Sequence, residues 1–319
     1  MNCTYLYKTS DHLSPAERSQ FLDLFSTVFP KTLTFEDFEN KYLKNPLGYA
    51  FHGLMVSDRK IVGAYNVIPY GYRYFGRQTL FGLSVDTMIH PDFRSGPFGL
   101  HQMAHQVLSR IQQEGVSFVF GFPNEQAISY TQKVLKWNTV GELDFYALPR
   151  HVGKVVPSLK WLNPVSRACS DTLVRQPFAR RRHTATYAVE KIRDNGFMEH
   201  RYHTGYNRIV SDHHEECVYR MHREPGDVNT LYVIDVWPLT PAAFDRSIRQ
   251  IYEVSGRSAD LILYVGKLPF QPIRMVKLPR TRQPRRLYMC GRVLDPGRVD
   301  DRIFHIQNWN INISNFDVR

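Results

Sequence analysis

Hydrophobic and polar positions change period in a regular order along the first part of the chain. Helical spacing of apolar residues predicts a helix over 15–29, where Ser14 and Glu17 form a capping-box pattern, and a second helix over 34–42. Strand-like segments follow at 52–56, 60–69, 71–75 and 78–88, and turn residues around 57–59 and Gly76 separate them as hairpins. Two helices followed by antiparallel strands are therefore expected before residue 90.

The segment 80–146 then alternates strands with helices. The pattern predicts strands at 80–89, 116–122 and 140–146, and helices at 100–113 and 125–136. The loop before the first of these helices contains Arg94, Gly96, Pro97 and Gly99. A helix start presents unpaired N–H groups, glycine allows close backbone approach, and arginine pairs with phosphate in bidentate fashion. This loop is therefore a candidate phosphate site.

This order of elements and loops resembles the acyl-CoA-binding core of the GNAT N-acyltransferase superfamily. In that family a V-x-P-x-x-R-x-x-G-x-G/A loop holds the CoA pyrophosphate on the following helix. Ile89, Pro91 and Arg94 match the first part of this motif, and Gly99 matches its last glycine. Pro97 replaces the first glycine and removes one N–H, so we expect a shifted register that uses Gly96.

The resemblance implies a set of residues that bind acyl-CoA, the only cofactor-like group expected, as acetyl-CoA or a short hydroxyacyl-CoA. Backbone N–H groups near the end of the first strand would bind pantetheine and the thioester carbonyl. Asn124, which follows the next strand, would bond the CoA arm or cap the following helix. The expected cofactor-binding residues are Met88, Ile89, Arg94, Ser95, Gly96, Phe98, Gly99 and Asn124.

Three residues are candidates for catalysis. Asp86 is an acid in an apolar strand and is either the base that takes the amine proton or a structural carboxylate. His90 titrates near neutrality but stands where a helix cap is equally expected. Tyr130 falls near the family's helix tyrosine and would protonate the thiolate, although the register also allows Thr131 at that place.

The second half of the chain repeats the order of the first in weaker form. A strand at 231–238, a helix at 241–253 and a strand at 260–269 match the spacing of the core, but no arginine-glycine loop is present, and 309–318 reads as a last strand. The expected class is α/β (α+β), a GNAT fold with a mixed central sheet followed by a second GNAT-like module without a CoA loop. The alternative is an unrelated α+β domain.

The expected domain boundaries follow from this repeat. Residues 1–148 would form the catalytic domain, 149–183 a proline-broken connector, and 184–319 a second domain that contributes to acceptor binding.

Composition limits the remaining possibilities. The chain has 319 residues, 43% of them hydrophobic, and no apolar run long enough to span a bilayer or act as a secretory signal. Four scattered cysteines favour reduced thiols and a cytoplasmic protein, and no metal site is expected. The net charge of +11 includes basic clusters at 175–182 and 280–286, read as a solvated surface or as contacts with a phosphorylated ligand or membrane. No nucleic-acid-binding module is recognised.

The two-module layout is similar to sugar N-acyltransferases of surface-polysaccharide pathways. The expected function is transfer of an acetyl or short hydroxyacyl group from acyl-CoA to the amine of a nucleotide-linked deoxy amino sugar. The alternatives are N-acetylation of an aminoglycoside, peptide or aminoacyl acceptor, and a non-catalytic GNAT-like binding protein.

Overall fold

The computed structural model describes residues 3–177, 187–202, 205–210, 215–255 and 258–316. It is an α/β structure with two mixed sheets, each belonging to one of two compact units. The first unit contains residues 1–142, 188–201 and 287–308, and the second contains 143–187, 202–286 and 309–319. These units differ from the expected domains 1–148 and 184–319, because 188–201 and 287–308 belong to the first unit and 143–148 to the second. Residues 149–177 of the expected connector 149–183 also belong to the second unit.

The sheet of the first unit runs in the order β1-β2-β3-β4-β5-β14-β6, with β8 paired to β3. The strands are β1 Thr4–Thr9, β2 Phe51–Ser57, β3 Lys60–Tyr74, β4 Arg77–Ile89, β5 Val116–Gly121, β6 Asn138–Glu142, β8 Val189–Lys191 and β14 Tyr288–Val293. β3 is one long strand where the sequence predicts two. β14 was not predicted, and it separates β5 from β6 by pairing with both.

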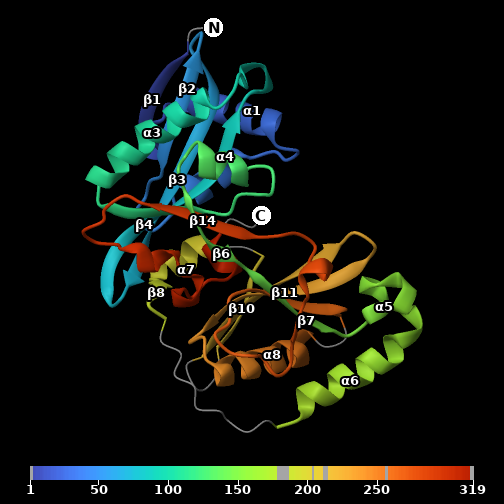
Figure 1. Ribbon diagram of the computed structural model, residues 1–319. Helices are drawn as coiled ribbons and strands as arrows, with labels where there is room; N and C mark the ends of the chain where they lie inside the picture. Colours follow the sequence, from blue (N-terminus) through green and yellow to red (C-terminus); the bar gives the residue numbers. More distant parts are fainter. Residues whose placement is uncertain (1–2, 178–186, 203–204, 211–214, 256–257, 317–319) are drawn as a thin grey trace. The chain divides into compact units, whose positions relative to one another are not determined.

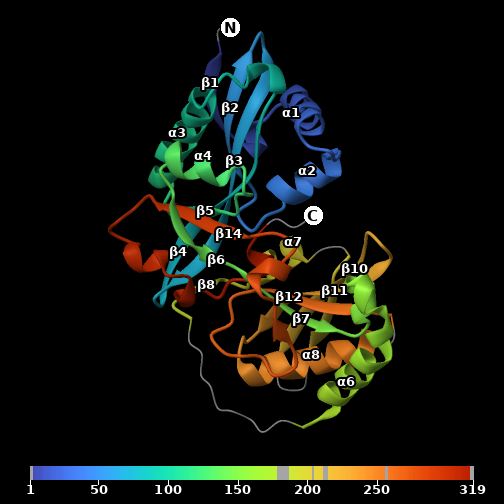
Figure 2. The same ribbon diagram turned by 45° about the vertical axis from the view of Figure 1, so that its right-hand side comes forward.

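Helices cover both faces of this sheet (Figures 1 and 2). The helices of the first unit are α1 Pro15–Val28, α2 Phe35–Tyr42, α3 Phe98–Gln113, α4 Ile128–Lys133 and α7 Asn195–Arg201. The capping box of α1 forms as the sequence predicts, with Ser14 and Glu17 bonded reciprocally. The predicted helix 125–136 is shorter than expected, because Asn124 caps a turn that ends before Ile128.

Successive residues of β2 face helices on opposite sides of the sheet. At Gly53 an added Cβ would lie 2.3 Å from the Met103 carbonyl of α3, so only glycine allows this approach. The next residue back, His52, packs edge-on against Phe21 of α1 and Tyr42 of α2. Strand periodicity therefore places α3 on one face and α1 with α2 on the other.

The sheet of the second unit runs in the order β13-β7-β12-β11-β10-β9. Its strands are β7 Asp144–Pro149, β9 Asn207–Val210, β10 Glu216–Glu224, β11 Val228–Trp237, β12 Leu261–Gly266 and β13 Val276–Lys277. Its helices are α5 Val152–Val155, α6 Asn163–Arg175 and α8 Pro241–Ser255. α8 buries Phe244, Ile248 and Ile251 in the core of this unit.

Two strand predictions are wrong. The predicted strand 140–146 is interrupted at Leu143, and its halves β6 and β7 join different sheets. The predicted strand 309–318 is described as far as Phe316, and this part forms only bridge positions at Trp309 and Asn312 and a short 3-10 turn at Ile313–Asn315. Its alternating pattern fails because almost every side chain from Trp309 to Phe316 is buried.

Candidate functional site

β4 and β5 separate part of the way along the first sheet. These parallel strands pair only from Leu80–Val116 to Leu83–Phe120, and β4 then continues alone on that edge to Ile89. The amide of His90 donates to the Val62 carbonyl across the sheet, at 2.8 Å. Because antiparallel pairing alternates, the N–H of Ile89 points to the opposite edge, toward the opening beside β5.

Arg94 lies at the same edge of β4. Its Nε donates to the Ile89 carbonyl oxygen at 2.9 Å, and the side chain is otherwise exposed. This bond fixes the start of the guanidinium beside the opening. Arg94 and the Ile89 amide therefore lie together at the end of β4.

Asp86 occupies a bulge in the same strand. The pairing of β3 and β4 shifts register between Ala64 and Asn66, and Asp86 takes a φ of +42°, which is unusual for a residue with a side chain. Its carboxylate accepts from Lys41 Nζ and from the Tyr42 hydroxyl, both at the end of α2. The Lys41 side chain is 3% exposed and that of Asp86 is 16% exposed, so the ion pair is almost enclosed.

A chain of hydrogen bonds between buried polar side chains supports the bulge. Asn66 donates from Nδ2 to the Asp86 carbonyl at 2.8 Å and bonds through Oδ1 to His52 Nδ1 at 2.7 Å. His52 Nε2 in turn meets the Ser10 hydroxyl at 2.8 Å. Burial lowers the pKa of His52 to about 4, so the ring is neutral at pH 7 and one nitrogen accepts while the other donates.

The loop between β4 and α3 has the conformation of a tight turn. Gly96 takes a φ of +93°, and Pro97 precedes the first residue of α3, Phe98, whose side chain is exposed. Gly99 lies against β2, where an added Cβ would be 3.2 Å from Met55 Sδ. The glycines thus serve different ends: Gly96 allows the turn, and Gly99 allows α3 to approach the sheet. Ser95 is exposed in the same loop.

A groove of about 660 Å³ extends from this loop along α3. It begins at Pro97 and Phe98, follows His101, His105 and Ser109 of α3, and is closed by the segment after α4 and by β14. Three cations line it on that far side, namely Lys133, Lys136 and Arg292. The groove therefore combines a helix N-terminus with positive side chains, which suits a ligand with several phosphates.

Three of the sequence candidates take structural positions. His90 caps the 3-10 turn Pro91–Phe93 by accepting from the Asp92 amide at 3.3 Å. Asn124 accepts from the Ala127 amide at 2.8 Å, which is the capping alternative. Thr131 is buried and donates to the Ala127 carbonyl, whereas Tyr130 is 57% exposed on α4.

Several residues at this site were missed by the sequence analysis. The pattern of residues 34–42 indicates only that Lys41 and Tyr42 lie in a helix. Nothing in the sequence shows that their side chains contact Asp86. Arg292 comes from β14, far along the chain. Lys133 and Lys136, three residues apart, could have been noticed as a basic end of the predicted helix.

The corresponding opening in the second sheet is filled by the chain itself. Parallel β11 and β12 pair only as far as Val233–Tyr264, and Gly266 at the end of β12 then bridges Asn312. β7 already occupies the other edge of β12 through Asp144, so Asn312 lies on the edge toward β11. Asn312 also donates to Asp235 of β11 at 2.9 Å. The segment around Asn312 therefore lies beside β12 where β11 and β12 separate.

In the described part of the chain, no group of three or more His, Cys, Asp or Glu residues is placed to hold a metal ion. The four cysteines, all within the described residues, are free thiols. No described helix is long and apolar enough to cross a membrane.

Part of the first unit is similar to a known family of domains. Residues 10–133 match the family model of the acetyltransferase (GNAT) domain. No protein in a search of curated sequences matches the chain.

Among solved structures, a GCN5-related N-acetyltransferase from Kribbella flavida is similar over 92% of this chain and 72% of its own, with 14% identity and a TM-score of 0.60. A GCN5-related N-acetyltransferase from Anabaena variabilis covers 92% and 73%, with 14% identity and a TM-score of 0.58. A conserved protein of unknown function from Enterococcus faecalis, described as a probable N-acyltransferase, covers 92% and 73%, with 15% identity and a TM-score of 0.58. At such low identities the likeness is one of fold, and it extends over both units.

Proposed function

We propose that this chain, which carries a GNAT acetyltransferase domain at residues 10–133, is an acyl-CoA-dependent N-acyltransferase whose site is the opening between β4 and β5. The observation that carries the proposal is the continuity between this opening and the basic groove along α3. Both begin at the loop 90–99, so one extended ligand can follow the strand edge, the loop and the groove in turn.

The groove fits the nucleotide end of CoA in size and charge. Its volume of about 660 Å³ lies in the range of roughly 300–1,000 Å³ typical of small-molecule sites. Arg94 and the first turn of α3 would hold the pyrophosphate, and Lys133, Lys136 and Arg292 would hold a further phosphate. Pro97 leaves the first turn with one N–H fewer, but Phe98 and Gly99 keep theirs.

The reaction proposed is direct attack of a neutral amine on the thioester carbonyl. The Ile89 N–H would donate to the carbonyl oxygen as it becomes an oxyanion. Asp86 would take the proton that the amine loses as the C–N bond forms, directly or through water. When the C–S bond breaks, the thiolate would receive a proton from Tyr130, whose exposed hydroxyl can exchange with solvent.

As the acceptor we propose the amine of a nucleotide-linked deoxy amino sugar, and as the transferred group an acetyl or short hydroxyacyl group. The net charge of +11 supports this acceptor, because acyl-CoA and a nucleotide-linked sugar both carry phosphates. This acceptor class is a finer proposal than acyl transfer itself and can fail without it.

The groove assignment is tested by calorimetric titration with CoA and with dephospho-CoA, which lacks the 3′-phosphate. Wild-type protein should bind CoA at least about tenfold more tightly than dephospho-CoA, because a charge-assisted phosphate contact is lost. The K133E/K136E variant should lose this preference. The K60E/R77E variant has the same net charge but changes exposed residues outside the groove, so it should keep the preference. Equal binding of both ligands by wild-type protein would remove the groove from the CoA site.

A further inference from the structure

The second unit exposes apolar side chains where a water-facing surface is normally polar. Trp161 is 74% exposed, the highest value among large apolar side chains of the described residues, and Val155 and Val165 are 43% and 55% exposed. Single exposed apolar residues are common, but these three lie within residues 155–165. A cluster of this kind points to a surface that is covered in some state of the protein.

The outer face of α6 continues this cluster. Val165, Ala168, Cys169 and Thr172 are exposed at helical spacing, whereas Ser170 and Val174 are buried on the opposite side. Arg167 and Arg175 are also exposed on α6, so its outer side carries apolar residues with basic ones beside them. We define the α5–α6 surface by Val155, Lys160, Trp161, Val165, Ala168 and Cys169.

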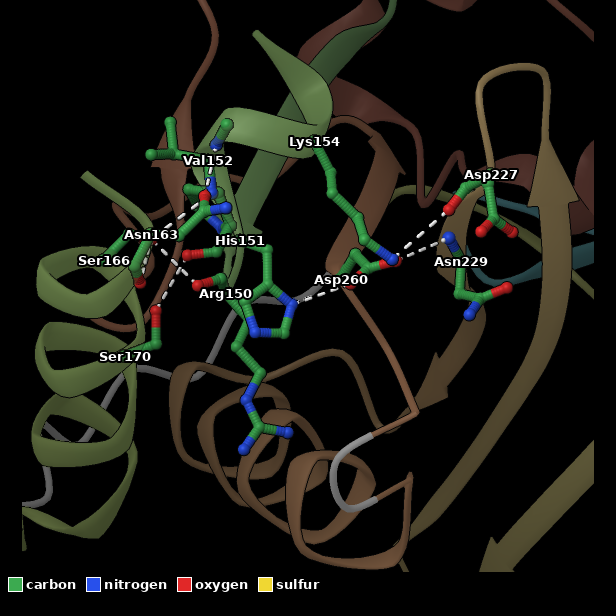
Figure 3. A network of polar contacts seen from close by, with 12 residues as sticks. Arg150, His151, Val152, Lys154, Asn163, Ser166, Ser170, Asp227, Asn229 and Asp260 are labelled. Atoms are coloured by element: carbon green, nitrogen blue, oxygen red, sulfur yellow. Dashed lines mark hydrogen bonds and ion pairs between the residues drawn. The ribbon is translucent and has the colours of Figure 1, made fainter. Parts of the chain in front are cut away.

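Basic side chains outnumber acidic ones around the surface. Residues 145–170 contain Arg150, Lys154, Lys160 and Arg167 and no Asp or Glu. Lys154 turns away from the surface, because its Nζ bonds to Asp260 at 2.9 Å (Figure 3). Lys160 is exposed beside the apolar residues, and Arg167 is half exposed on α6, where its Nε lies 4.0 Å from the Asp171 carboxylate.

Hydrogen bonds join the start of α5 to the start of α6 (Figure 3). Asn163 accepts from the Gly153 amide at 2.6 Å, and Ser166 bonds to both Val152 and the Arg150 carbonyl. Gly153 packs so closely on Lys160 that a Cβ there would lie 2.2 Å from the Lys160 Cα. Trp161 is therefore presented on a fixed scaffold.

We propose that the α5–α6 surface docks the protein on the face of a bilayer containing anionic lipids. A tryptophan ring is stable at the level of lipid headgroups, valine side chains enter the apolar layer just below, and Lys and Arg pair with lipid phosphates. A nucleic acid offers no place for the valines. A protein partner would need both an apolar and an acidic face, whereas an anionic bilayer supplies both over any area.

The test is co-sedimentation of the full chain with vesicles of phosphatidylcholine alone and of phosphatidylcholine mixed with phosphatidylglycerol. The wild-type protein should sediment with the mixed vesicles only. W161A and K160E/R167E should each lower the partition coefficient about tenfold or more, since one removes the apolar anchor and the other the lipid-phosphate contacts. The K60E/R77E variant, with the same net charge as K160E/R167E, should bind like the wild type.

Fluorescence identifies the residue that enters the bilayer. Binding to mixed vesicles should shift tryptophan emission to shorter wavelength, and W161F should bind with a much smaller shift. Three outcomes overturn the proposal: no sedimentation with mixed vesicles, unchanged binding of W161A, or an equal loss in K60E/R77E. Capture of duplex DNA in place of vesicles would assign the surface to nucleic acid and would also overturn it.

Discussion

At the scale of single residues, the candidate site depends on how Asp86 is held. The sequence marks Asp86 as an acid in an apolar strand and leaves open whether it reacts or merely supports. In the structure it lies in a bulge, paired with Lys41 and Tyr42 and supported through Asn66. His90 and Asn124, also proposed from the sequence, are hydrogen-bonded as caps. Asp86 is therefore the strongest candidate for the base.

Replacing Asp86 by asparagine keeps the size of the side chain and removes the base. We expect D86N to lower kcat about 100-fold or more, in line with the contribution of a positioned base, while acetyl-CoA affinity changes little. Steady-state kinetics and calorimetry measure the two quantities. The control is D92N, an exposed carboxylate in the following turn, which should retain activity. Near-normal turnover of D86N at neutral pH would exclude Asp86 as the base.

His52 makes the stability of the first unit depend on pH. Burial lowers the pKa of His52 from 6.5 to about 4, so between these values the unfolded chain binds a proton that the folded protein does not. The stabilisation of the folded state by neutral His52 is therefore fully present above pH 6.5. As the pH falls toward 4, the free energy of unfolding decreases by up to about 3 kcal/mol from this cause.

This pH dependence is measured by chemical denaturation from pH 7 to 4. The H52Q variant should be less stable than wild type at pH 7 and should lose less stability as the pH falls. The H12Q variant removes an exposed histidine and should follow the wild-type slope. Parallel slopes for wild type and H52Q would contradict the assignment of a buried, neutral His52.

At the scale of elements, β14 is the least expected feature of the first sheet. A strand at residues 288–293 inserts between β5 and β6 and brings Arg292 to the groove. Its sequence allows this insertion at Gly291, where an added Cβ would lie 2.2 Å from the Phe118 ring. Met289 and Cys290 are fully buried beside it. β14 therefore joins distant parts of the chain into one sheet.

A side chain at position 291 should disrupt this insertion. We expect G291V to lower the free energy of unfolding by about 3 kcal/mol, because the core around Phe118 has no space for it. Urea denaturation measures the change. G76A sits in a turn where nothing lies within 4 Å of an added Cβ, so its smaller cost should come from backbone strain alone. A G291V protein as stable as wild type would mean that β14 is not inserted as described.

At the scale of the whole molecule, local patterns predict elements better than they predict sheets. The capping residues Ser14 and Thr34 and the change from strand to helical period locate α1, α2, α3 and α8 closely. The segment 140–146 reads as one strand because nothing local shows that its two halves enter different sheets. The insertion of β14 depends on contacts made far along the chain, which no local pattern contains.

The same contrast between local sequence patterns and long-range contacts applies to the candidate site. The residues from Arg94 to Gly99 indicate a candidate phosphate loop, and the structure confirms that a helix begins there, at Phe98. The partners of Asp86 were not predicted, because Lys41 and Tyr42 reach it only after α2 packs on the sheet. Sequence thus indicates candidate residues one by one, whereas tertiary packing decides which side chains they contact.

The most direct test of the account is release of thiol from acetyl-CoA in the presence of amines, including a nucleotide-linked deoxy amino sugar. The account predicts release that requires both protein and amine and that saturates with acetyl-CoA. In R94A the KM for acetyl-CoA should rise about tenfold or more, because a bidentate phosphate contact is lost. Thiol release that does not depend on any amine, or an unchanged KM in R94A, would contradict the assignment of this loop and opening as an acyl-CoA site.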